Sequence, residues 1–163
     1  MRMIERRLIG IYLEDHWAGA TGGVELARRL RSSNRESEWA EDLARVCGEV
    51  EADREALGDV MKALGVRRNL PKAYGAWAME KVGRLKLNGR LTGYSPLSRV
   101  VELEMLMIGI TGKLGLWEGL RSAGRSELGG FDFEELAKRA EAQREVVKKI
   151  HRAATTEAFA RED

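Results

Sequence analysis

The chain has 163 residues, of which 44% are apolar and 33% charged. This length and balance suit one folded domain with a buried core rather than a disordered chain. With 28 basic and 26 acidic residues the net charge is only +2, so the chain lacks the strong positive field that favours nucleic-acid binding. The single cysteine, Cys47, excludes an internal disulfide and favours a reducing, cytoplasmic location. The most apolar window, 103–120, carries three charged residues, which argues against a membrane span.

Two long helices are predicted first. Apolar residues recur at three- and four-residue steps over 3–32 and again over 36–64. The polar stretch 32–34 separates the two segments, and Gly65 is suited to cap the second at its C-terminal end. Because the connection is so short, we expect the two helices to form an antiparallel hairpin.

A less regular stretch, 66–94, follows the hairpin. Pro71 can open a short helix over 71–87 within it. The next long helix is predicted over 96–123 and is apolar nearly all round, so we expect it to be the most buried element. Its four glycines, at 109, 112, 115 and 119, each cost roughly 1 kcal/mol relative to alanine, and we expect close approach of a neighbouring helix to compensate.

The last helix is predicted over 132–160. Asp132 is its expected N-cap, with Glu135 as the capping-box partner. The whole chain, 1–163, is therefore predicted to be a single all-α domain. Its order is that of an up-down-down-up four-helix bundle, with a long crossover that contains the short extra helix.

A layer of charged residues is predicted near the middle of this bundle. At about 1.5 Å of rise per residue, several polar positions fall at similar heights when counted from the turns between helices. Gln143 flanks the same level. The residues assigned to this mid-bundle charged layer are Glu14, Asp15, Asp53, Arg54, Lys113 and Arg144.

Two related motifs lie in the second and fourth helices. They read Glu-Ala-Asp-Arg over 51–54 and Glu-Ala-Gln-Arg over 141–144. With this connectivity, the chain resembles the ferritin-like superfamily, the di-iron carboxylate bundles in which these motifs would be Glu-x-x-His. Arginine has no lone pair for a cation, so the resemblance implies a divergent member with a lost metal site and no cofactor. Instead, we expect Arg54 to be buried and paired with Glu14 or Asp15.

An atypical iron or manganese site is the alternative that the resemblance leaves open. Asp15 could be a further ligand of this site. A separate site shared between His16 and His151, with Asp15 beside them, is also possible. The metal-ligand candidates are Glu14, His16, Glu51, Glu104 and Glu141.

Three functional hypotheses follow. The first is a non-catalytic bundle that acts as a dimer or binds a protein partner, with no membrane role, because no intact catalytic motif is present. The second is an atypical metal-binding protein for iron oxidation or storage, related to stress. The third is a small-molecule pocket inside the bundle, with Met105 and Met107 as flexible lining. The candidate interface anchors for the first hypothesis are Trp39, Tyr74, Trp77 and Trp117.

Overall fold

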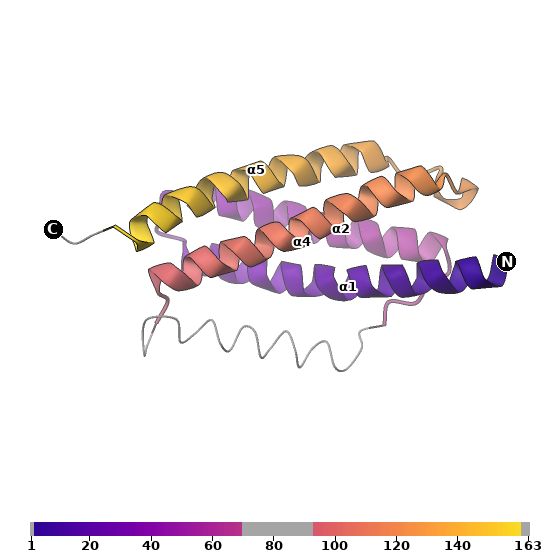
Figure 1. Ribbon diagram of the computed structural model, residues 1–163, viewed down its shortest axis with the longest axis horizontal. Coiled ribbons are helices and arrows are strands. Elements are labelled where there is room, and N and C mark those ends of the chain that lie inside the picture. The colour runs from indigo at the N-terminus through magenta and orange to yellow at the C-terminus, as the bar shows by residue number, and fades with distance from the viewer. Residues whose placement is uncertain (1, 70–92, 161–163) are drawn as a thin grey trace.

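The computed structural model describes residues 2–69 and 93–160. These ranges contain four long helices and one short 3₁₀ helix and no strands, which confirms an all-α four-helix architecture. Figure 1 shows α1 and α5 running in one direction and α2 and α4 in the other. The elements are α1 (Arg2–Ser33), α2 (Ala40–Ala63), α4 (Pro96–Ala123), η1 (Ser126–Leu128) and α5 (Phe133–Ala158). The short helix predicted over 71–87 lies outside the described residues.

Local signals set the ends of α4 and α5. The Ser95 side chain accepts a hydrogen bond from the backbone N–H of Ser98, and Gly124 ends α4 in the left-handed conformation at φ 56°. The Asp132 side chain accepts from the backbone N–H of Glu135, as the capping-box pattern predicted. These two helices therefore begin within one residue of their predicted starts.

The connection between α1 and α2 is longer than predicted. Asn34 is buried, and its side-chain amide donates to the carbonyl of Leu30 at 2.7 Å. Its own backbone carbonyl accepts from both the N–H and the hydroxyl of Ser37. These bonds hold the chain in turns after α1, so α2 begins at Ala40 rather than at residue 36.

The core forms where the apolar stripes of the four helices meet. Cys47 is fully buried within it. Trp39 and Trp117 are also buried, which rules them out as surface anchors for a partner. The other two candidate anchors, Tyr74 and Trp77, lie outside the described residues. None of the helices in the described ranges is long and apolar enough to cross a bilayer.

The prediction that α4 is the most buried element is wrong, because nine of its 28 residues are buried against nine of 24 in α2. Ile108 is 72% exposed. The prediction of a close helix contact at the glycines is also wrong for Gly109, Gly112 and Gly115, where a β-carbon would meet no heavy atom of the described residues within 4 Å. At Gly119 such an atom would meet only the Tyr12 hydroxyl, at 3.7 Å. The missing side chains leave space instead of admitting a neighbouring backbone.

Candidate functional site

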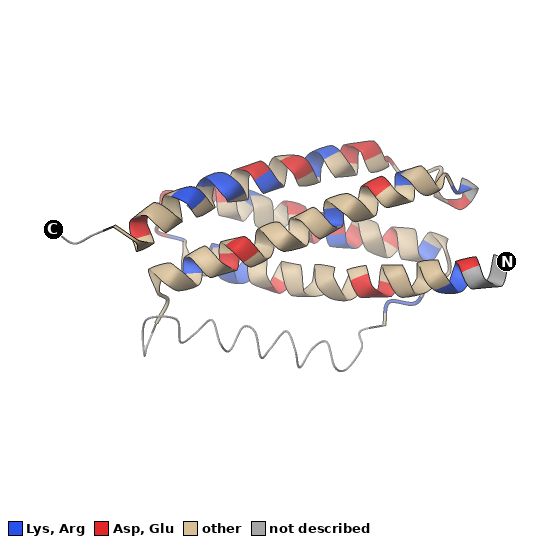
Figure 2. Cartoon of the chain, in the orientation of Figure 1, with Lys and Arg blue, Asp and Glu red and all other residues tan. Residues whose placement is uncertain are grey.

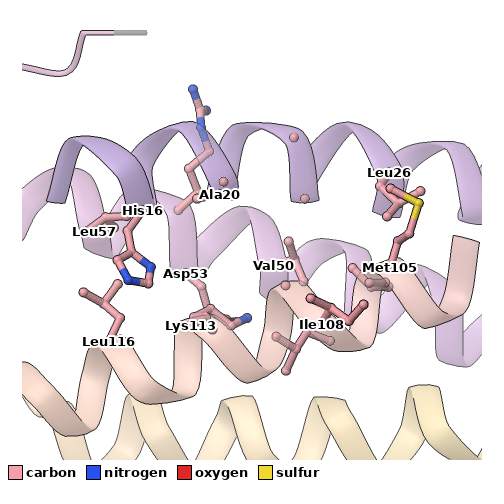
Figure 3. Close-up of a pocket in the computed structure, with 18 of the residues that line it drawn as sticks. His16, Ala20, Leu26, Val50, Asp53, Leu57, Met105, Ile108, Lys113 and Leu116 are labelled. Carbon is pink, nitrogen blue, oxygen red and sulfur yellow. Dashed lines mark hydrogen bonds and ion pairs between the residues drawn. The ribbon is translucent and has the colours of Figure 1, made fainter. Parts of the chain in front are cut away.

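A cavity of about 490 Å³ lies between α1, α2 and α4. Figure 3 shows side chains from all three helices around it, with His16 reaching from α1 toward Leu116 on α4. Its lining is mainly apolar, and the large apolar side chains are Leu26, Val50, Leu57, Met105, Leu106, Ile108, Ile110, Leu116 and Trp117.

Glycines open the cavity along two facing helices. Gly19, Gly22 and Gly23 line it from α1, and Gly109 and Gly112 line it from α4. Successive glycines three or four positions apart share one face of a helix, so each helix presents bare backbone over about a turn. The cavity thus lies where both helices lack side chains, and at Gly109 and Gly112 the sequence had predicted close packing instead.

A buried ion cluster borders the cavity at mid-bundle. Asp53 on α2 is only 2% exposed, and three side chains from α4 and α5 surround it. Its Oδ2 accepts from Lys113 Nζ at 2.5 Å and from Gln143 Nε2 at 3.0 Å, while Oδ1 accepts from Arg139 Nε at 2.8 Å. Arg139 Nη2 also donates to Oδ1. We call these four residues the Asp53 cluster.

The Asp53 cluster carries more positive than negative charge. One carboxylate faces two cations, Lys113 and Arg139, and Gln143 is neutral. Burial lowers the pKa of Lys113, and the charge and hydrogen bond of Asp53 oppose that effect. Because Lys113 Nζ also donates to Gln143 Oε1 at 2.5 Å, the ammonium is held between α2 and α5. The cluster thus links α2 to α4 and α5 and fixes their register.

The predicted charged layer is present in part. The structure brings Asp53 and Lys113 together and adds Gln143, which was expected at the same level. Sequence reasoning missed Arg139. The signal was its position four residues before Gln143, which puts both on one face of α5.

The expected role of Arg54 is wrong. Its side chain is 28% exposed and lies over the Trp17 ring, 4.4 Å from the ring centroid. It donates to Thr21 Oγ1 at 3.2 Å and pairs with Glu55 at 3.5 Å. Adjacent residues on a helix point about 100° apart, so Asp53 and Arg54 cannot both face the bundle centre.

The other predicted members of the layer lie elsewhere. Glu14 is half-buried and Asp15 exposed, and neither pairs with Arg54. Asp15 lines the cavity from α1. Arg144 pairs with Glu141 at 2.5 Å on the outer part of α5.

The proposed metal ligands are also scattered. Glu51 accepts a hydrogen bond from Arg28 at 2.7 Å, and Glu104 Oε1 lies 2.9 Å from His151 Nε2. Glu141 accepts a hydrogen bond from Arg144. His16 packs edge-on against Tyr12, and burial lowers its pKa. Across 2–69 and 93–160 no three His, Cys, Asp or Glu side chains converge as a metal would require. These residues do not fit a di-iron centre, since the two motif arginines are committed to Trp17 and Glu141.

A second buried acid was not predicted. Glu102 on α4 is 0% exposed and pairs with Arg29 on α1. The Tyr94 hydroxyl donates to Glu102 Oε2 at 3.0 Å. Burial raises the pKa of Glu102, with Arg29 and Tyr94 opposing the shift. This pair joins α1 to α4, and an acid between Val101 and Leu103 in an apolar run was the sequence signal.

Comparisons with known proteins give no relative. No protein-family model, no curated protein and no solved structure matches the chain significantly. The resemblance to the ferritin-like superfamily therefore stays a prediction.

Proposed function

We propose that the protein binds a small, largely apolar molecule in the cavity between α1, α2 and α4. The observation that carries the proposal is the cavity itself. Its volume of about 490 Å³ falls within the roughly 300–1,000 Å³ typical of small-molecule sites. Such sites combine apolar walls with a few placed polar groups. Here the polar groups on the lining are Asp53 and Lys113 of the Asp53 cluster, together with Asp15, His16 and Arg54.

The cost of the glycines supports this proposal. A glycine within a helix costs roughly 1 kcal/mol relative to alanine. Gly109 and Gly112 gain no close packing in return, because a β-carbon at either position would lie in open space. A bound molecule would supply the missing contacts, and Met105 on the same wall can adapt to its shape.

The few charges on the central turns of α4, which border the cavity, are consistent with this role. Figure 2 shows charges of both signs along α5, whereas the central turns of α4 are largely uncharged. Ile108 lies on these turns, lines the cavity and is exposed.

A fluorescent probe tests the proposal. N-phenylnaphthylamine is apolar and uncharged, and its emission rises on transfer from water to an apolar site. We expect saturable binding to the wild type and at least tenfold weaker binding to Gly109→Leu, whose side chain would fill the cavity. Gly115→Leu is the matched control, because Gly115 is on the same helix in open space and does not line the cavity. Equal binding to both variants would place the probe elsewhere and refute the site.

A homo-oligomer is the second candidate, and exposed apolar residues on α1 favour it. Leu8, Ile11 and Tyr12 are 61%, 48% and 41% exposed and lie at three- and four-residue spacing on one side of the helix. Light scattering after size exclusion should show a dimer that Leu8→Glu dissociates. A wild-type monomer at high protein concentration would remove this candidate.

We further propose that the protein is a metal-free member of the ferritin-like superfamily and is located in the cytoplasm. The parallel direction of α2 and α4 in Figure 1 supports the superfamily assignment. The free, buried Cys47 is compatible with a reducing compartment.

A further inference from the structure

The polar side of the cavity has a hydrogen-bond donor that the described residues leave unpaired. Lys113 lines the cavity, and its ammonium has three N–H donors. Two are used, one by Asp53 and one by Gln143. The third has no partner among the described residues.

A second donor lies one helical turn away. Trp117 also lines the cavity and is fully buried, and its indole N–H has no hydrogen-bond partner in the described part of the chain. Because Lys113 and Trp117 are four residues apart on α4, they share one face of the helix. The indole nitrogen is out of reach of a water-sized molecule, so Lys113 is the donor that a molecule in the cavity can reach.

Within 2–69 and 93–160, the acid next to Lys113 has no spare capacity to accept this donor. Asp53 already accepts from Lys113, Arg139 and Gln143 through both of its oxygens. The four members of the cluster carry one more positive than negative charge, and Glu49, whose charge also acts on Lys113, does not line the cavity. Of the other charged groups that line the cavity, Arg54 is cationic and half-buried, and the single remaining acid, Asp15, is exposed.

We infer that the ligand is an apolar molecule with one carboxylate, whose oxygens accept from Lys113 while its apolar body lies along the glycine-lined walls. This inference rests on the proposed function and names the ligand class. A carboxylate fits both features of this side of the cavity, since it only accepts hydrogen bonds and it neutralises the surplus charge. An ammonium head group would meet donors and a like charge.

A head-group series tests the inference. Decanoate, decanol and decylamine have the same alkyl chain and differ in the polar end. The affinity of each compound is measured by displacement of N-phenylnaphthylamine from the wild-type protein, with the compound kept below its own critical micelle concentration. We expect decanoate to bind at least tenfold more tightly than decanol, as a charged hydrogen bond requires, and decylamine to bind most weakly. If decanol and decanoate bind equally, the proposed function stands and the carboxylate assignment is overturned.

Two variants locate the head group. Lys113→Met should weaken decanoate binding about tenfold while changing decanol binding less than about twofold, because the lost interaction is charge-assisted. Lys138→Met is the matched control, since Lys138 is an exposed lysine on α5 that pairs with Glu134 outside the cavity. If Lys113→Met does not fold, Lys113→Gln keeps a polar side chain, removes only the charge, and should still reduce the preference for decanoate over decanol. An unchanged preference in a folded Lys113→Met protein refutes the inference, and a failure of all three compounds to bind refutes the proposed function as well.

Discussion

Replacing Asp53 with asparagine should strongly destabilise the fold. The side chain keeps its size and loses its charge, so Lys113 and Arg139 lose the carboxylate that lies between them. Removing one partner of a buried ion pair costs about 3–5 kcal/mol. Lys113 is 15% exposed but Arg139 is 32% exposed, and partial solvation of the arginine places the expected loss near the lower end, at about 3 kcal/mol.

Urea denaturation followed by far-ultraviolet circular dichroism measures this loss as a change in the free energy of unfolding. For a chain of this size, a loss of about 3 kcal/mol corresponds to a fall of roughly 6–12 °C in melting temperature. Asp59→Asn is the control, because Asp59 lies on the same helix, is exposed, and is 3.9 Å from its partner Arg68. That variant should change the unfolding free energy by no more than about 0.5 kcal/mol.

The result that would refute the reasoning is a loss of less than about 1 kcal/mol for Asp53→Asn, since a carboxylate that neutralises two partly buried cations cannot contribute so little. A double variant sharpens the comparison. Adding Lys113→Met to Asp53→Asn removes one of the two unpaired cations, so it should recover part of the lost stability rather than add to the loss.

Three further predictions concern other parts of the chain. Gly115→Ala should raise the free energy of unfolding by about 0.5–1 kcal/mol, since its β-carbon would lie in open space, whereas Gly124→Ala should lower it because Gly124 has φ 56°. Because the pKa of Glu102 is raised above 4.5 in the folded state, its contribution to stability is fully present below that pH and is lost as pH rises through the raised pKa. In urea titrations from about pH 4 to about pH 7, Glu102→Gln should therefore gain stability relative to the wild type, and parallel pH profiles would contradict this. Burial raises the pKa of Cys47, so iodoacetamide should label it, as detected by mass spectrometry, only after denaturation, and labelling of the native protein would argue against a buried thiol.

Helix identity and helix ends could be read from the sequence because their causes are local. Apolar spacing of three and four residues requires only the helical repeat, and the Asp132 cap requires only a neighbour three residues on. The start of α2 was misplaced because the turns before it depend on Asn34, whose side chain bonds to Arg99 on α4 at 2.7 Å. That contact joins residues 65 positions apart, and no local pattern contains it.

The candidate site could be predicted only in part. Heights along the bundle follow from the rise per residue, so Asp53 and Lys113 were correctly assigned to one level. Heights do not determine rotation about each helix axis, so Arg54 was assigned to the interior, where Asp53 lies instead. Arg139 was missed for the same reason.

The glycines of α4 separate what the sequence determined from what the tertiary structure decided. The sequence by itself determined four amphipathic helices, their caps and a repeated absence of side chains along one helix. Whether bare backbone admits a neighbouring helix or leaves a cavity depends on the distance between α1 and α4. That distance is set by side chains from different helices packing together, including the buried pair of Glu102 and Arg29. Only the tertiary structure decided it, and with it the candidate function of the protein.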